Sequence, residues 1–150
     1  MNRTAFAPLV VVRAPRRYGL RPAALRRTVE LTLEYAPMRV AGEIGVAIID
    51  DDEMRLLNRR YLNKDAPTDV LSFPLDGHAC AGEPFGDIAI SYDTARRQAQ
   101  AYGATLAREI DRLLVHGVLH LCGYSHDRPR EAARMHGIAK RVMRKLAQRA

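Results

Sequence analysis

Three histidines in the C-terminal third of the chain have the spacing of a metal site. His116 and His120 are four residues apart, and His126 follows six residues later. Side chains at i and i+4 lie on one face of a helix, where they can bind the same ion. Gly123 can adopt a left-handed conformation that turns the chain back and brings His126 to the same point. Three neutral imidazoles with an open fourth position are typical of catalytic zinc, so we expect one zinc ion per chain.

The helix that carries these histidines also allows a second interpretation. It is apolar nearly all round, and a histidine there can be a core residue whose ring nitrogens are satisfied by neighbours. Two buried imidazoles without partners would each cost roughly 1–3 kcal/mol. The third histidine follows a glycine at the spacing of the metzincin motif H-E-x-x-H-x-x-G-x-x-H. We therefore favour a metal, although imidazole ligands also suit nickel, copper and iron.

Gly117 occupies the position of the catalytic glutamate in that motif. In metalloproteases this glutamate is the general base that deprotonates the zinc-bound water. Zinc alone can still lower the pKa of its bound water to ~7. Peptide hydrolysis also needs a proton for the leaving amine, whereas a phosphodiester needs mainly charge stabilisation and RNA supplies its own 2′-hydroxyl nucleophile. The chemistry therefore favours a nuclease over a zinc peptidase.

The chain is strongly basic, with a formal net charge of +7 and a pI near 9.9. Of its 24 basic residues, 21 are arginines. This balance favours a polyanionic partner such as nucleic acid, although an arginine-rich proteome would produce the same bias. No aromatic stacking motif accompanies it, because the chain has no Trp and its Phe and Tyr residues are scattered.

Composition and length indicate an ordinary globular chain, which we expect to form one domain over residues 1–150. Apolar residues make up 47% of it and charged residues 27%. No apolar run approaches the ~20 residues of a membrane span, and Leu9–Val12 is too short for a secretory signal. Cys80 and Cys122 fit no zinc or redox spacing, so we expect free thiols and a cytoplasmic location.

Hydrophobic periodicity and capping signals predict four short strands among five helices. The expected strands are 9–12, 43–49, 70–73 and a segment near 87–90. The expected helices are 21–35, 53–62, 93–102, 105–121 and one starting at Pro129. No helix separates the third and fourth strands, which favours an antiparallel pair. We therefore predict an α/β (α+β) fold with a small mixed sheet and a zincin-like metal site on a helix. The helix from 53 should bury Met54, Leu57 and Tyr61.

Several stretches of the chain resemble the YbeY family of rRNA-maturation endoribonucleases. His116–His126 resembles the family signature H-G-x-L-H-L-x-G-Y-D-H. A second block of the family is matched by Leu57-Asn58 through Tyr61, Lys64-Asp65 and Pro67–Pro74. A third block is matched by Gly86–Ile88. The matching blocks lie in the family's order and span residues 57–126.

This resemblance implies a bacterial, zinc-dependent endoribonuclease specific for single-stranded RNA. Its implied roles are 16S rRNA 3′-end maturation and ribosome quality control, with His116, His120 and His126 as metal ligands. The implied partners are rRNA, the small ribosomal subunit and assembly factors such as the Era GTPase. The alternative is a ribosome-assembly RNA-binding factor with a mainly structural metal and weak or no cleavage, and a zinc peptidase ranks third.

The chain departs from the family pattern at two positions. The family commonly has an arginine after the tyrosine of the second block, which is tied to RNA cleavage, and this chain has Leu62 there. Arg59 lies one helical turn earlier, so we hypothesise that it replaces the missing guanidinium. The alternative is a solvated arginine on an amphipathic helix. Ser125 stands where the signature has an aspartate that could orient a ligand histidine, and it lacks the charge.

Other polar residues of these blocks are weaker candidates for the cleft. Asp69, Ser72 and Asp87 could line it, although Asp69 is explained equally well as a turn cap. We interpret His78, in a glycine-rich loop, and His136, on the C-terminal helix, as surface residues.

Overall fold

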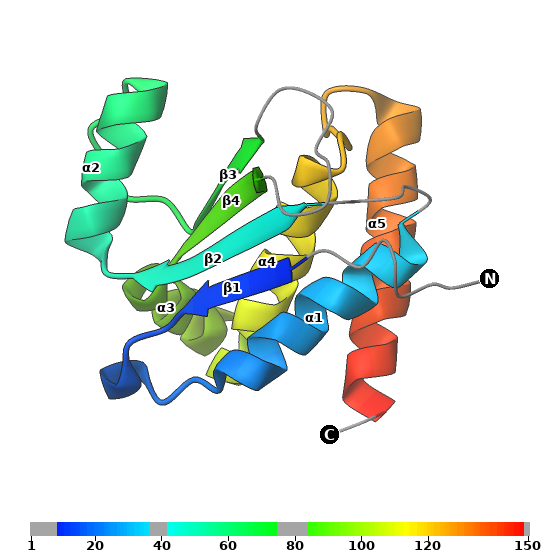
Figure 1. Ribbon diagram of the computed structural model, residues 1–150, viewed down its shortest axis with the longest axis horizontal. Coiled ribbons are helices and arrows are strands. Elements are labelled where there is room, and N and C mark those ends of the chain that lie inside the picture. The colour runs from blue at the N-terminus through cyan, green and yellow to red at the C-terminus, as the bar shows by residue number, and fades with distance from the viewer. Residues whose placement is uncertain (1–8, 37–41, 75–83, 149–150) are drawn as a thin grey trace.

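The computed structural model describes residues 9–36, 42–74 and 84–148, and its core is a four-stranded sheet packed with helices (Figure 1). The strands are β1 (Leu9–Arg13), β2 (Glu43–Ile49), β3 (Val70–Pro74) and β4 (Pro84–Ser91). The helices are α1 (Pro22–Tyr35), α2 (Asp51–Leu62), α3 (Tyr92–Tyr102), α4 (Leu106–Leu121) and α5 (Pro129–Gln148), with a short 3-10 turn at Arg16–Tyr18. The predicted α/β fold is confirmed. Among these helices, none is long and apolar enough to cross a membrane.

The sheet has the strand order β1-β2-β4-β3 and is mixed. β1, β2 and β4 run parallel, while β3 pairs antiparallel with β4, as the missing helix between them predicted. β3 is therefore an edge strand. Its position matters for the site, because its residues contact helices on both faces of the sheet.

The two faces of the sheet are covered unequally. Ile88 belongs to the main core with α4, whereas its neighbour Ala89 packs with Met54 of α2. Because successive residues of a strand point to opposite faces, α2 lies on one face and α4 on the other. α1, α3 and α5 pack around α4 (Figure 1). The histidine helix is thus held between the sheet and three other helices.

The N-terminus of α2 is fixed by acidic residues. We expected the helix to begin at Glu53, but Asp50 is the cap, its carboxylate accepting from the Glu53 N–H at 2.8 Å, and the helix begins at Asp51. The Asp51 carboxylate also accepts from the hydroxyls of Ser91 at 2.6 Å and Thr94 at 2.7 Å. In return, Asp93 accepts from the Asp51 N–H at 2.9 Å. This exchange ties the start of α2 to the start of α3.

The inner side of α2 differs in one position from the prediction. Met54 is fully buried, but Tyr61 is 57% exposed, with one side of its ring against Phe73 at a centroid distance of 5.1 Å. Asn58 is the buried residue of this turn, and its Nδ2 donates to the Ala66 carbonyl at 2.8 Å. The amide faces inward because it holds the loop that leads to β3.

Candidate metal centre

The C-terminal end of α4 and the loop that follows bring the three histidines together. His116 and His120 lie one turn apart on α4, and Gly123 follows the helix with φ of 93°. Backbone hydrogen bonds from Gly123 N–H to the His120 carbonyl and from Tyr124 N–H to the Leu119 carbonyl close the turn. The predicted chain reversal at Gly123 is confirmed.

The three Nε2 atoms converge on one point. The His116 Nε2 lies 2.9 Å from the His120 Nε2 and 2.8 Å from the His126 Nε2. All three possible ligand atoms lie within 4.8 Å of one another, and they are the one such group among the described residues. Tetrahedral zinc with bonds of 2.0–2.1 Å would hold its nitrogens about 3.3 Å apart. The two distances from the His116 Nε2 would each lengthen by about 0.4–0.5 Å around such an ion.

The hydrogen bond of His120 shows which of its nitrogens is available to a metal. Its Nδ1 lies 2.9 Å from the Tyr124 carbonyl oxygen. A carbonyl oxygen can only accept, so Nδ1 carries the hydrogen, and in the neutral ring Nε2 holds a lone pair. This Nε2 lies 2.9 Å from the Nε2 of His116. A backbone carbonyl on the far ring nitrogen is the usual partner of a metal-binding histidine.

The environment of the histidines favours their neutral forms. Burial, together with the charges of His120 and His126, lowers the pKa of His116 to about 4. Burial also lowers the pKa of His120. Neutral imidazole is the form that binds a metal, so these two rings are ready ligands at pH 7. His126 is exposed, which leaves one side of the cluster open to a substrate.

Gly117 allows α4 to pack directly against the sheet. Its carbonyl accepts a hydrogen bond from the Ser72 hydroxyl at 3.0 Å. A Cβ at position 117 would lie 2.9 Å from the Cγ2 of Ile88 and 3.3 Å from the Ser72 Oγ. The position faces β3 and β4, so a glutamate there would be driven into the sheet. The packing gives a physical reason why this site has no metzincin base.

The other sequence candidates are not gathered around the histidines. The Asp69 carboxylate accepts from the Val70 N–H at 2.7 Å and from Gln98 at 3.3 Å, and these bonds fix the start of β3. Asp87 lies over Gly45, on the sheet face opposite to α4. Ser72 does reach α4, through the Gly117 carbonyl. Asp69 is thus a structural cap, and Asp87 faces away from the cluster.

Residue 125 does not orient a histidine. The Ser125 hydroxyl accepts from the Asp127 N–H at 3.1 Å, and its own N–H donates to Glu131 at 3.1 Å. These bonds shape the loop around His126, and the orienting contact to His120 comes from the Tyr124 backbone instead. Sequence reasoning missed that contact because a backbone carbonyl has no residue signature.

Three remaining predictions have simple outcomes. His136 is exposed, as expected of a residue on the polar face of α5. Cys122 is a free, buried thiol, and its burial raises its pKa to about 11. His78 and Cys80 lie outside the described residues.

Arg59 lies on the exposed side of α2, on the other face of the sheet from α4. Within residues 9–36, 42–74 and 84–148 it forms no ion pair. β3 lies between α2 and the histidine helix: Phe73 contacts Tyr61 of α2, and Ser72 contacts α4. The structure therefore places Arg59 near the same edge of the sheet without bringing it into contact with a histidine.

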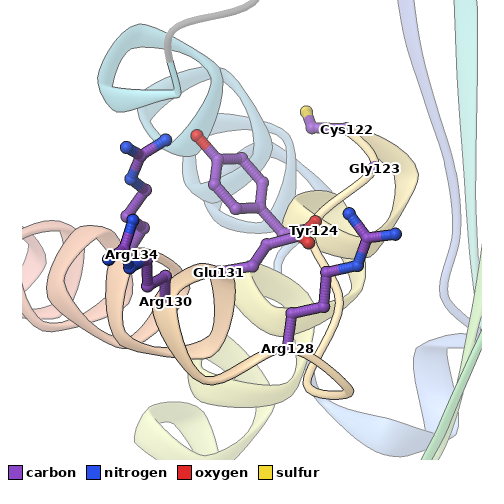
Figure 2. A pocket seen from close by; sticks show the side chains of 7 residues that line it. All are labelled: Cys122, Gly123, Tyr124, Arg128, Arg130, Glu131 and Arg134. Atoms are coloured by element: carbon purple, nitrogen blue, oxygen red, sulfur yellow. The ribbon is translucent and has the colours of Figure 1, made fainter.

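A basic pocket beside the histidine cluster was not predicted. It has a volume of about 480 Å³ and lies where the loop after α4 meets α5 (Figure 2). Its walls include Tyr124 and the arginines Arg128, Arg130 and Arg134. The signal available in the sequence was the density of arginines directly after the third histidine.

A sequence model of the family described as "Endoribonuclease YbeY" matches residues 21–147. This chain belongs to the YbeY endoribonuclease family. A Myxococcus xanthus protein of that name is 46% identical over 104 residues, which cover 67% of this chain and 35% of the relative. A YbeY endoribonuclease of Chloroflexus aurantiacus is 45% identical over 127 residues, which cover 79% of this chain and 82% of the relative.

The lengths of the YbeY relatives differ. This chain spans about a third of the Myxococcus protein and half of an Anaeromyxobacter relative that is 47% identical over 97 residues. A solution structure of a Thermotoga maritima protein has a TM-score of 0.64 with 23% sequence identity, covering 93% of this chain and 88% of that one. At this identity the similarity concerns the fold alone, and it agrees with the mixed α/β architecture of this chain.

Proposed function

We propose that this chain is a metal-dependent endoribonuclease that cleaves single-stranded RNA, with one zinc ion held by His116, His120 and His126. The convergence of the three Nε2 atoms at an exposed end of α4 supports this proposal most strongly. Membership of the YbeY endoribonuclease family points to RNA as the substrate. By the same resemblance, we propose the 3′ end of 16S rRNA as the target, with roles in ribosome quality control in the cytoplasm. The small ribosomal subunit and assembly factors such as the Era GTPase would be its partners.

The protein's own groups would bind and orient the substrate. Zinc, when bound, supplies Lewis acidity toward the scissile phosphate and a bound water of lowered pKa. The Tyr124 carbonyl holds His120 in the tautomer that presents Nε2, and burial keeps His116 neutral. Gly117 leaves no room for a protein base beside the first ligand. RNA is suited to such a site, because its 2′-hydroxyl is a nucleophile within the substrate.

Arg59 is our candidate for the guanidinium that the family carries after its tyrosine. Leu62 occupies that position and is 53% exposed, so it offers no charge to a phosphate. Arg59 is on the preceding turn of α2. Tyr61 of the same helix contacts Phe73 of β3, and the neighbouring β3 residue, Ser72, reaches α4. RNA lying across the β3 edge would meet both α2 and the histidine cluster. In this position Arg59 would neutralise phosphate charge.

The second candidate function is an RNA-binding assembly factor whose metal is chiefly structural. The observation that favours it is Leu62, because the residue tied to cleavage in the family is absent. Such a protein would keep the metal and the affinity for RNA but would turn over little RNA.

One set of incubations separates these functions. Metal-loaded protein, chelated protein and the His120→Ala variant are each incubated with a labelled single-stranded RNA and with casein. Metal-dependent RNA cleavage that the variant lacks supports the nuclease. RNA binding without cleavage supports the assembly factor and contradicts the nuclease, and cleavage of casein contradicts both.

A further inference from the structure

The pocket beside the histidine cluster has the size of a ligand site. Its volume of about 480 Å³ falls within the 300–1,000 Å³ that is typical of small-molecule sites. The loop after α4 supplies Cys122, Gly123 and Tyr124, and the region around the first turn of α5 supplies the charged residues. Figure 2 shows the Tyr124 ring between the side chains of Arg134 and Arg128.

The charge of the pocket is positive. Three guanidinium groups line it, from Arg128, Arg130 and Arg134, against the single carboxylate of Glu131. That carboxylate already accepts a hydrogen bond from the Ser125 N–H at 3.1 Å. In the described part of the chain, none of the three arginines forms an ion pair. The pocket therefore offers donors for an anion that the protein itself does not supply.

The stability of α5 does not explain these arginines. The N-terminus of a helix carries a partial positive charge, so cations in its first turn are unfavourable and acids are preferred. α5 begins at Pro129, and Arg128 and Arg130 flank that residue directly. Arginines at this end of a helix oppose the helix dipole, which favours a function in binding over a function in folding.

The pocket and the histidine cluster share a wall. The Tyr124 carbonyl accepts from His120, while the Tyr124 side chain lines the pocket. His126 lies midway along the chain between Tyr124 and Arg128, and both of these residues line the pocket. Tyr124 therefore lies between the pocket and the histidine cluster, with its carbonyl toward His120 and its side chain in the pocket.

We propose that this pocket binds a phosphate group of the RNA strand that flanks the cleaved position. Guanidinium groups bind phosphate oxygens through paired, charge-assisted hydrogen bonds, and the Tyr124 ring offers a surface for the adjoining nucleotide. The proposal rests on the proposed function, because the ligand is the same RNA. It adds a second site, on the loop after α4 and the start of α5, that would hold the strand.

The test measures RNA affinity without cleavage. A fluorescently labelled single-stranded RNA is titrated into chelated protein at several salt concentrations. The Arg130→Ala/Arg134→Ala double variant is compared with Lys140→Ala/Arg144→Ala, which removes the same charge at the same spacing from exposed positions of α5. For single-stranded nucleic acid, each phosphate that the protein neutralises contributes about −0.7 to the slope of the logarithm of the association constant against the logarithm of the salt concentration. We expect the pocket variant to lose at least about tenfold in affinity and to have a slope shallower by about 0.7, the value for one phosphate. The control should stay within about twofold.

Equal losses in the two variants would overturn the proposal, because they would show an effect of overall charge. Unchanged affinity in the pocket variant, or a wild-type protein that binds no RNA, would overturn it as well. Bound metal and thermal unfolding of the pocket variant should match the wild type, since neither arginine contacts a histidine. The outcome is separate from the nuclease: pocket-dependent binding without metal-dependent cleavage would leave this site standing and contradict the proposed function. Metal-dependent cleavage together with wild-type RNA affinity in the pocket variant would support the proposed function and contradict the phosphate site.

Discussion

The Nδ1 atom of His120 lies 2.9 Å from the carbonyl oxygen of Tyr124, four residues later in the chain. This contact links the end of α4 to the loop that carries His126. It sets the tautomer of His120, and it depends on the turn at Gly123, whose φ is 93°. The geometry of the histidine cluster is therefore as much a product of the helix end as of the histidines themselves.

The Gly123→Ala variant should weaken both folding and metal binding. A non-glycine residue in this conformation costs about 1–2 kcal/mol, and relaxing the strain would move the Tyr124 carbonyl away from His120. Gly103, at the end of α3 with φ of 67°, is the matched control. We expect similar destabilisation from Gly103→Ala in denaturant unfolding, but a loss of zinc affinity only in Gly123→Ala. Equal zinc affinities in the two variants would show that the turn does not shape the site.

Two helical glycines should respond to alanine with opposite signs. Gly117→Ala brings a methyl group within 2.9 Å of Ile88, and overpacking of this kind costs about 1–3 kcal/mol, against a gain in helix propensity of up to ~1 kcal/mol. Gly137, in α5, has no neighbour within 4 Å of the added Cβ. We expect Gly117→Ala to lower the free energy of unfolding by about 1 kcal/mol and Gly137→Ala to raise it by about 0.5–1 kcal/mol. Stabilisation by Gly117→Ala would contradict the close packing of α4 on β4.

The Asp51 carboxylate should make stability depend on acidic pH. Burial opposes its ionised form, but hydrogen bonds from Ser91, Thr94 and Arg97 outweigh burial and lower its pKa. A lowered pKa in the folded state stabilises the protein above the unfolded value near 3.8, and that contribution is lost as the pH falls through the folded pKa. Asp51→Asn should therefore cost about 1 kcal/mol at pH 7.

The difference between Asp51→Asn and the wild type should shrink in urea unfolding below about pH 4. Asp52, the exposed neighbour in the same turn, is the control, and Asp52→Asn should cost no more than about 0.5 kcal/mol. A pH-independent difference for Asp51→Asn would mean that its charge is not the stabilising feature.

Arg59→Ala tests whether this arginine replaces the one absent at position 62. We expect RNA cleavage to fall by at least about 100-fold with bound metal unchanged, because a lost transition-state contact to phosphate is costly. Arg60 is exposed on the same turn and serves as the control for charge, so Arg60→Ala should keep cleavage within about threefold. Unchanged cleavage in Arg59→Ala would leave Arg59 as a solvated surface residue.

The features that the sequence predicted are those that depend on local spacing. The i, i+4 histidines and the glycine turn each involve residues within one or two turns, and the structure has them. The antiparallel pairing of β3 with β4 also followed from the absence of a predicted helix between them. Local patterns suffice because they fix which side chains share a helix face or a turn.

The features that could not be predicted depend on packing between distant segments. The fit of Gly117 against Ile88 requires the position of α4 on the sheet, and the inward turn of Asn58 in place of Tyr61 requires the loop at Ala66. The Tyr124 carbonyl and the arginine pocket arise where the α4 loop meets α5. No periodicity or motif in the sequence indicates these contacts, because they form only when distant elements pack together.

Metal analysis of the purified protein tests most directly whether the three histidines hold one metal ion. Zinc content is measured by mass spectrometry for the wild type and for His120→Ala, and X-ray absorption of the wild type reports the ligands. We expect about one zinc per wild-type chain with three nitrogen ligands at 2.0–2.1 Å, and its loss from His120→Ala. Equal metal content in the two proteins, or a metal-free wild type that cannot be loaded with zinc, would contradict the claim.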